Sequence, residues 1–153
     1  MTHQHPREER LLKQLIGEWQ VGIAMKTVDG KVVAGCGEMT AIEKDSIINS
    51  EVNTRIEGYE DYYENDMWSY DPEKGEIHLL SMTSDGQIQD HIGKWIDDNT
   101  LELGWRGTFE DQDKEECISA KWVSNDQFEL RQTNYSQGKL LLTIDYVFKR
   151  KDG

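Results

Sequence analysis

Five tight-turn dipeptides divide the stretch between Trp19 and Arg150 into short runs, and this punctuation is the strongest constraint on the fold. They are Asp29-Gly30, Glu57-Gly58, Asp85-Gly86, Asp98-Asn99 and Gln137-Gly138. The runs between them alternate apolar and polar residues, and none carries a helical pattern long enough to connect parallel strands. The sequence therefore predicts an all-β fold, a single antiparallel up-and-down barrel of about ten strands whose interior is packed or holds one small ligand.

Only the N-terminal segment shows helical periodicity. Its apolar residues fall on one face of a helix from Arg7 onward, and Gly17 ends the pattern. They are Leu11, Leu12, Leu15 and Ile16. We expect a short amphipathic helix that closes one end of the barrel. A chain of 153 residues with two prolines is expected to form one domain over 1-153, with 1-6 as a mobile tail.

A formal net charge of -13 restricts the partners. The acidic field repels phosphate backbones and anionic lipids, so neither nucleic acid nor a membrane is expected as a partner. The first ten residues are mostly polar and charged, and no uncharged apolar run reaches about 18 residues, which favours a cytoplasmic location. Phosphate-binding loops, nucleophile elbows and zinc-ligand pairs are missing from the sequence, so we expect no cofactor and no metal.

Strand pairing through two-residue turns predicts which side chains face the interior. A two-residue loop at Asp85-Gly86 sets Leu79 opposite Ile92, and one at Asp98-Asn99 sets Ile92 opposite Trp105. A one-residue slip would expose the whole apolar face, so that face is expected inside. It carries Ile77, Leu79, Ile88, Ile92, Ile96, Leu101, Leu103 and Trp105, together with Ser81, Asp90 and Lys94. The residues expected outside are His78, His91, Trp95 and Arg106.

The same construction applies to two further hairpins. At Glu57-Gly58 it turns Tyr63, Asn65 and Met67 inward, opposite Val52, Ser50 and Ile48. It leaves Tyr62, Trp68 and Tyr70 outside, where they could cover the seam of a homodimer. Near the C-terminus a three-residue loop over 136-138 pairs Leu130 with Ile144 and Phe128 with Tyr146, and turns Gln132 and Asn134 inward.

This inferred interior holds more polar groups than a dry core tolerates, because each unpaired one costs about 1 to 3 kcal/mol. Their number favours a ligand cavity, and the alternative is that they bond one another or lie at the rim. The predicted ligand-binding residues are Tyr63, Asn65, Ser81, Asp90, Trp105, Gln132 and Tyr146. Asp90 is the most specific of these candidates and is expected to act as a polar anchor for the ligand or as a general base. The structural alternative is an ion pair with Lys94.

Several motifs resemble a known family. Gly17-Glu18-Trp19, entering the first strand after a short helix, is similar to the Gly-x-Trp entrance of lipocalin and calycin barrels. The chain also resembles a prokaryotic lipocalin-like family of unknown function that carries a Tyr-Asp-Pro-x-x-Gly hairpin. The matching stretches are Trp68-Ser69-Tyr70-Asp71-Pro72-Glu73-Lys74-Gly75, Ser84-Asp85-Gly86, Gly93-Lys94-Trp95 and Leu101-Glu102-Leu103.

The resemblance implies a barrel of about ten strands with a central cavity and no established activity or catalytic residues. The related nitrobindin group holds haem through a late histidine, and this chain has no histidine after His91. Fatty-acid-binding barrels anchor carboxylates with inward arginines, whereas Arg106 and Arg131 are expected outside.

Three functions remain open. The favoured one is a binding protein that holds a small, mostly apolar or amphipathic molecule in the barrel. The second is a cavity enzyme of isomerase or hydrolase type that uses Asp90 with Tyr63 or Tyr146. The third is a structural or homodimeric interaction protein with a filled barrel.

Overall fold

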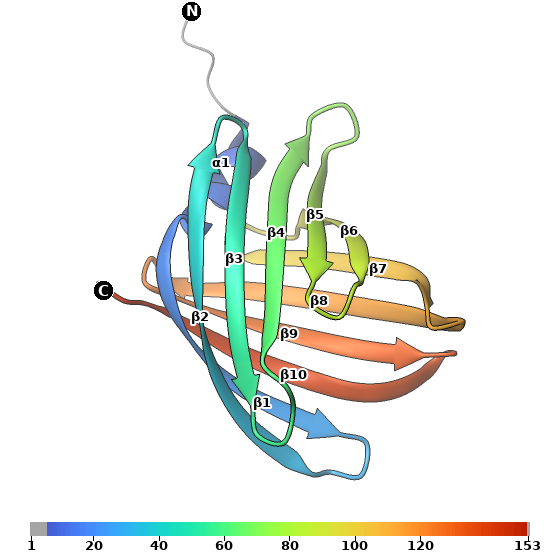
Figure 1. Ribbon diagram of the computed structural model, residues 1–153. Coiled ribbons are helices and arrows are strands. Elements are labelled where there is room, and N and C mark those ends of the chain that lie inside the picture. Colours follow the sequence, from blue (N-terminus) through green and yellow to red (C-terminus); the bar gives the residue numbers. More distant parts are fainter. Residues whose placement is uncertain (1–5, 153) are drawn as a thin grey trace, which may run out of the picture.

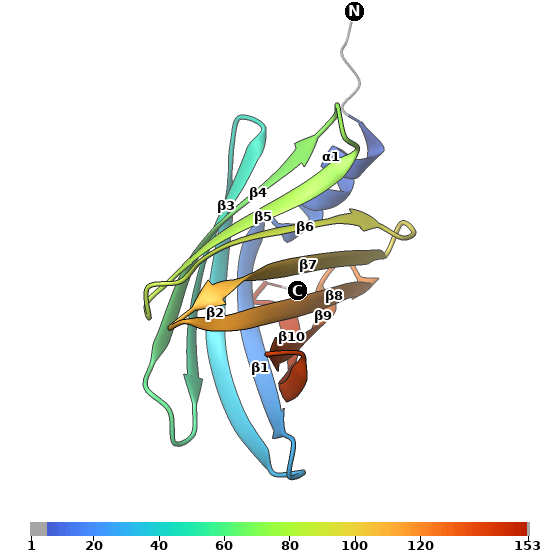
Figure 2. The same ribbon diagram turned by 90° about the vertical axis from the view of Figure 1, so that its right-hand side faces the viewer.

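The computed structural model describes residues 6–152, and over that range it shows a closed barrel of ten antiparallel strands (Figures 1 and 2). Neighbours in the chain pair with one another, and β1 closes on β10 with Trp19 opposite Arg150. The predicted fold class is confirmed. The strands are β1 (Gly17–Thr27), β2 (Val32–Lys44), β3 (Ile47–Ile56), β4 (Tyr62–Asp71), β5 (Glu76–Thr83), β6 (Ile88–Trp95), β7 (Thr100–Phe109), β8 (Gln112–Ser124), β9 (Gln127–Ser136) and β10 (Lys139–Arg150).

The predicted N-terminal helix is α1 (Arg7–Leu12), continued by the 3-10 turn η1 (Lys13–Leu15). It closes one end of the barrel, because Leu12 and Leu15 are buried and the Trp19 indole Nε1 donates to the Leu15 carbonyl at 2.9 Å. The Arg150 guanidinium fastens this plug: it donates to the carbonyls of Ile16 and Gln14 at 2.6 and 3.1 Å. It also lies 4.1 Å from the centroid of the Trp19 ring.

The mobile tail expected over 1-6 falls almost wholly on residues 1–5, which lie outside the described residues. No helix within the described range is long and apolar enough to cross a membrane.

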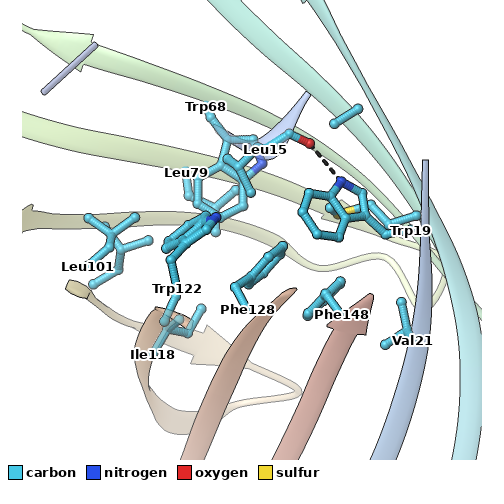
Figure 3. Close-up of a cluster of buried hydrophobic side chains, with 14 of the residues drawn as sticks. Leu15, Trp19, Val21, Trp68, Leu79, Leu101, Ile118, Trp122, Phe128 and Phe148 are labelled. Carbon is cyan, nitrogen blue, oxygen red and sulfur yellow. Dashed lines mark hydrogen bonds between the residues drawn. The ribbon is translucent and has the colours of Figure 1, made fainter. Parts of the chain in front are cut away.

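The apolar core fills the closed end of the barrel (Figure 3). Phe128 stacks on Phe148 with centroids 4.3 Å apart and on Trp122 at 4.7 Å, and it meets Trp19 edge-on at 4.9 Å. Aromatic rings at these separations add to the hydrophobic stabilisation that burial supplies. Packed rings therefore occupy this end and leave any hollow to the other.

The hairpin between β5 and β6 has a three-residue loop, not the two-residue loop expected from Asp85-Gly86. Thr83 N donates to Gln87 O at 3.0 Å, and Gly86 takes the left-handed conformation, with φ 88°. The added residue sets Leu79 opposite His91 instead of Ile92. The predicted register of this hairpin is wrong by one residue.

A second shift follows between β6 and β7, where Ile96 N donates to Thr100 O and three residues form the loop. Trp95 therefore lies opposite Leu101. The two shifts cancel on β7, so the prediction that Ile77, Leu79, Leu101 and Leu103 face inward is confirmed.

On β6 the two shifts do not cancel, and the strand presents the opposite face to that predicted. Gln89, His91 and Trp95 are buried, whereas Ile88, Ile92 and Ile96 are 70%, 41% and 60% exposed. The inward placement predicted for Ile88, Asp90, Ile92, Lys94 and Ile96 is wrong, as is the outward placement of His91 and Trp95. Packing decides the face, since Trp95 contacts Trp122 with centroids 5.3 Å apart and His91 pairs with Glu116. His78 and Arg106 lie on the outer side, as expected.

Strand β4 also presents the opposite face to that predicted. Its pairing with β3 is displaced by one residue from the predicted register, so that Thr54 lies opposite Tyr62 and Ser50 opposite Asp66. The side chains that face inward are Tyr62, Glu64, Asp66 and Trp68, and those that face outward are Tyr63, Asn65 and Met67. Trp68 is 5% exposed and Tyr70 packs against the core, so the predicted aromatic dimer seam does not form on the outer surface.

In the hairpin between β9 and β10 the side chains face as predicted, although the loop differs from the one expected. Its loop is two residues, Gln137 and Gly138, both with positive φ, and a bulge between Leu140 and Leu142 adds a further shift. Phe128 therefore pairs with Phe148 and Leu130 with Tyr146, so the predicted partners Tyr146 and Ile144 are wrong. Because the total displacement is two residues, Gln132 and Asn134 still face inward.

Candidate functional site

A cavity of about 640 Å³ occupies the end of the barrel opposite the helical plug. Its walls come from the hairpin ends after β3, β5 and β7 and from the inward faces of β8, β9 and β10. Exposed loop residues such as Tyr59, Glu60 and Asp85 form its rim, so it opens to solvent there. Trp105, Ile144 and Tyr146 supply apolar wall, and Gln132 and Asn134 supply amide groups.

A recess of about 70 Å³ continues the cavity toward the core. The two spaces share six lining residues, which are Thr54, Tyr62, Glu64, Glu116, Gln132 and Tyr146. Leu15 of the plug and Phe128 of the core border the recess on the closed side. The recess has room for a few water molecules or one small functional group.

Three carboxylates line this recess, and we call Glu64, Asp66 and Glu116 the acidic cluster. Glu64 and Asp66 alternate on β4, so the inversion of that strand turns both inward. Asp66 is 3% and Glu116 9% exposed. No Lys or Arg of the described chain lines the recess to balance them.

His91 is the basic neighbour of the cluster and is 1% exposed. Its Nε2 lies 2.8 Å from Glu116 Oε1, a distance typical of a charge-assisted hydrogen bond. Two buried polar atoms nearby, Asp66 Oδ1 and His91 Nδ1, have no hydrogen-bond partner among residues 6–152. Since buried polar groups are nearly always paired, these two atoms require an explanation.

Burial and mutual repulsion raise the pKa values of two carboxyls. Burial raises the pKa of Asp66 to about 6, an effect that the Ser81 hydroxyl partly offsets. The pKa of Glu64 lies well above its ordinary value, first because of burial and then because of the charges on Asp66 and Glu116. Burial likewise raises the pKa values of the Tyr62 and Tyr146 phenols, which therefore stay neutral.

The larger cavity is also acidic. Among residues 6–152, seven carboxylates line it against a single ammonium group, that of Lys114. These carboxylates belong to Glu60, Asp61, Glu64, Asp85, Glu110, Glu115 and Glu116. Arg106 does not line the cavity, but it forms a salt bridge with one of these carboxylates, its Nη2 lying 3.3 Å from Glu115 Oε1. Six aromatic side chains complete the walls: Tyr59, Tyr62, Trp105, Phe109, Tyr135 and Tyr146.

The residues predicted from sequence to bind a ligand separate into two groups. Ser81 borders the recess, Trp105 the larger cavity, and Gln132 and Tyr146 both. The other three, Tyr63, Asn65 and Asp90, do not line either space.

The three side chains outside the cavity have surroundings of their own. Tyr63 is 37% exposed, and Asn65 Oδ1 accepts a bond from Asn49 Nδ2 at 2.8 Å. Asp90 Oδ1 lies 3.2 Å from His78 Nδ1 on the outer surface, not beside Lys94 in the interior. Asp90 and Tyr146 therefore lie on opposite sides of the barrel wall and cannot act on one molecule in the cavity.

Sequence reasoning missed Glu64, Asp66, His91 and Glu116. The signal was present in the Tyr62-x-Glu64-x-Asp66-x-Trp68 alternation, but Tyr63-x-Asn65-x-Met67 alternates equally well. The register between β3 and β4, which the connecting loop sets, determines which of these two faces points inward. Within residues 6–152, no group of three or more His, Cys, Asp or Glu side chains could hold a metal ion.

No family model and no curated protein matches the chain by sequence. Solved structures match it along nearly their whole length, among them the following two. Rv2717c from M. tuberculosis is 15% identical, with 96% of this chain and 98% of that one covered and a TM-score of 0.71. The S-type phycobiliprotein lyase CPES from Guillardia theta is 13% identical, with 95% and 93% covered and a TM-score of 0.70. These likenesses show the fold, and they confirm the lipocalin-like, calycin-type barrel indicated by the Gly-x-Trp and Tyr-Asp-Pro motifs.

Proposed function

We propose that this barrel is a binding protein that holds one small amphipathic molecule in its cavity. The observation that carries the proposal is the 640 Å³ space itself, a volume within the range of about 300 to 1,000 Å³ found for ligand sites. Trp105, Ile144 and Tyr146 would bury the apolar body of the ligand. Ser81, Gln132 and the acidic cluster would orient its polar end.

The position of the plug supports this proposal. Packed rings and α1 fill one end of the barrel, while the other end is open and polar. A barrel that served only as a structural unit would gain stability by filling the second end as well, because each cavity-lining apolar group forfeits packing contacts. An open end with converging polar groups is the arrangement typical of a ligand site.

The uncharged fluorescent dye Nile red tests the proposal. Wild-type protein is expected to bind it and raise its emission, because the dye is transferred from water to an aromatic cavity. Asn134 lines the cavity near its rim, and Asn134→Trp fills that space. This variant is expected to bind the dye about tenfold or more weakly, as for any loss of roughly 1.4 kcal/mol of contact.

Glu129→Trp is the matched control, since Glu129 lies on the same strand but on the exposed outer face. It adds an indole without entering the cavity, and dye binding is expected to remain as in the wild type. A wild-type protein that fails to bind the dye, or equal binding by both tryptophan variants, contradicts the proposal.

A further inference from the structure

We infer that the ligand is an organic cation whose protonated amine enters the recess and donates N–H bonds to the acidic cluster. This inference rests on the proposed function and names the chemical class of its ligand. It follows from three independent observations: unpaired buried acceptors, uncompensated negative charge, and the size and walls of the two connected spaces.

The first observation concerns hydrogen bonding. Asp66 Oδ1 is a buried acceptor with no partner among the described residues. When His91 Nε2 donates to Glu116 in the neutral imidazole, Nδ1 is left as a second acceptor. Groups of this kind are costly to leave unpaired, and an N–H donor satisfies them. An ammonium group carries up to three N–H donors and no acceptor, which fits a recess whose unmet groups are acceptors.

The second observation concerns charge. Glu64, Asp66 and Glu116 face one another across the recess, and of the described side chains His91 is the one basic group that borders it. The pKa values of Glu64 and Asp66 are raised, first by burial, so this environment favours their protonated forms. A bound cation reverses this preference, because an opposite charge within a few ångströms favours the ionised form. The acidic rim would attract cations toward the same place.

The third observation concerns shape. The 70 Å³ recess accommodates an ammonium group and the carbon that bears it, and the 640 Å³ cavity takes the remainder of the molecule. Tyr62 and Tyr146 border both spaces, so their neutral rings would flank the charged nitrogen. Aromatic faces stabilise cations beyond simple burial. An arylalkylamine has this combination of a compact cation and a flat apolar body.

Four phenyl compounds that differ only in the terminal group test the inference by isothermal titration calorimetry. They are 2-phenylethylamine, N,N,N-trimethyl-2-phenylethylammonium, 2-phenylethanol and phenylacetate. We expect 2-phenylethylamine to bind at least about tenfold more tightly than the alcohol, and phenylacetate to bind weakest. The trimethyl compound is expected to bind less tightly than the amine because it has no N–H donor.

Two variants and one control locate the interaction. Asp66→Asn and Glu64→Gln each remove one carboxylate of the recess, and each is expected to weaken amine binding about tenfold while changing alcohol binding less than about threefold. Asp90→Asn removes the same charge from the outer surface. It is expected to leave both affinities within about twofold of the wild type, because exposed charges contribute little.

The dependence on pH adds a readout that structural damage would not mimic. The groups facing Asp66 are Glu64 on its own strand, Ser81 on β5, His91 on β6 and Glu116 on β8. Because the pKa of Asp66 is about 6, this carboxyl ionises as the pH rises from 5 to 8, so amine affinity is expected to rise while alcohol affinity stays level.

The outcomes separate this inference from the proposed function. If the alcohol or phenylacetate binds as tightly as the amine, or if Asp66→Asn and Asp90→Asn bind the amine alike, the cation inference is overturned and the binding function stands. If no phenyl compound binds but Nile red does, the inference is again overturned. If neither the phenyl series nor Nile red binds, both fail. Equal binding of the trimethyl compound and the amine overturns the role assigned to N–H donation.

Discussion

Asp66 is an ionisable carboxyl whose buried, acidic surroundings conflict with its negative charge. It is 3% exposed, one of its oxygens has no hydrogen-bond partner within the described part of the chain, and two other carboxylates lie close to it. A protein that only needed a stable core would gain by replacing such a group with an apolar residue of similar size. Its presence is explained if a cation completes the site.

This conflict predicts a dependence of stability on pH. The pKa of Asp66 is about 6 in the folded protein against 3.8 for the ordinary group, so folding favours the protonated form. The stability that this proton provides is fully present below about pH 4 and is lost as the pH rises through about 6. A shift of this size corresponds to about 2 to 3 kcal/mol.

Asp66→Asn removes this titration. Relative to wild type, the variant is expected to gain about 2 kcal/mol of unfolding free energy on going from pH 4 to pH 8. Urea denaturation at several pH values in the absence of ligand measures this difference, and the surface charges shared by both proteins cancel. A stability difference that does not change with pH contradicts the burial of an ionisable Asp66.

Strand β6 shows why some elements were predictable from sequence and others were not. The inward faces of β1, β5 and β7 follow from simple alternation, because their apolar residues fall on one side. Ile88 and Ile92 on β6, with Ile96 directly after it, form the more apolar face by sequence, yet they are exposed. The strand register is set by the three-residue loops on either side of it, and tertiary packing of Trp95 and His91 outweighs the isoleucine pattern.

Close backbone contact reinforces the observed register. A Cβ added to Gly93 would meet the Glu102 carbonyl oxygen at 1.8 Å, so only glycine fits where β6 approaches β7. A single sequence does not reveal this contact, nor does it reveal the loop length that turns Glu64 and Asp66 inward on β4. The cavity was therefore predictable from the polar residues that do face inward, such as Ser81, Gln132 and Tyr146, whereas the acidic cluster at its floor was not.

The register of β6 makes a mutational prediction. Trp95→Ala is expected to lower the free energy of unfolding by about 3 to 5 kcal/mol, because it removes a buried ring that packs on Trp122. Ile92→Thr, three positions away but 41% exposed, is expected to change it by less than about 1 kcal/mol. Urea denaturation of both variants provides the measurement. The reverse order, with Ile92→Thr the more damaging, would restore the register expected from two-residue turns.

The whole molecule divides into two zones along the barrel axis. The plug and the stacked rings of Trp122, Phe128 and Phe148 form a packed, closed end, and the acidic cavity forms an open one. The closed end supplies the stability that allows the other end to keep unpaired polar groups and repelling charges. A homodimer and a cytoplasmic location stay predictions, and the aromatic residues first expected at a dimer seam belong to the interior.

A crystal structure that resolves ordered solvent would test whether the barrel is hollow. We predict electron density for water or a bound small molecule between Trp105, Gln132 and Tyr146, with an atom within about 3 Å of Asp66 Oδ1. A barrel in which those side chains have collapsed onto one another, leaving no space above Asp66, would contradict the existence of the cavity and with it the proposed binding function.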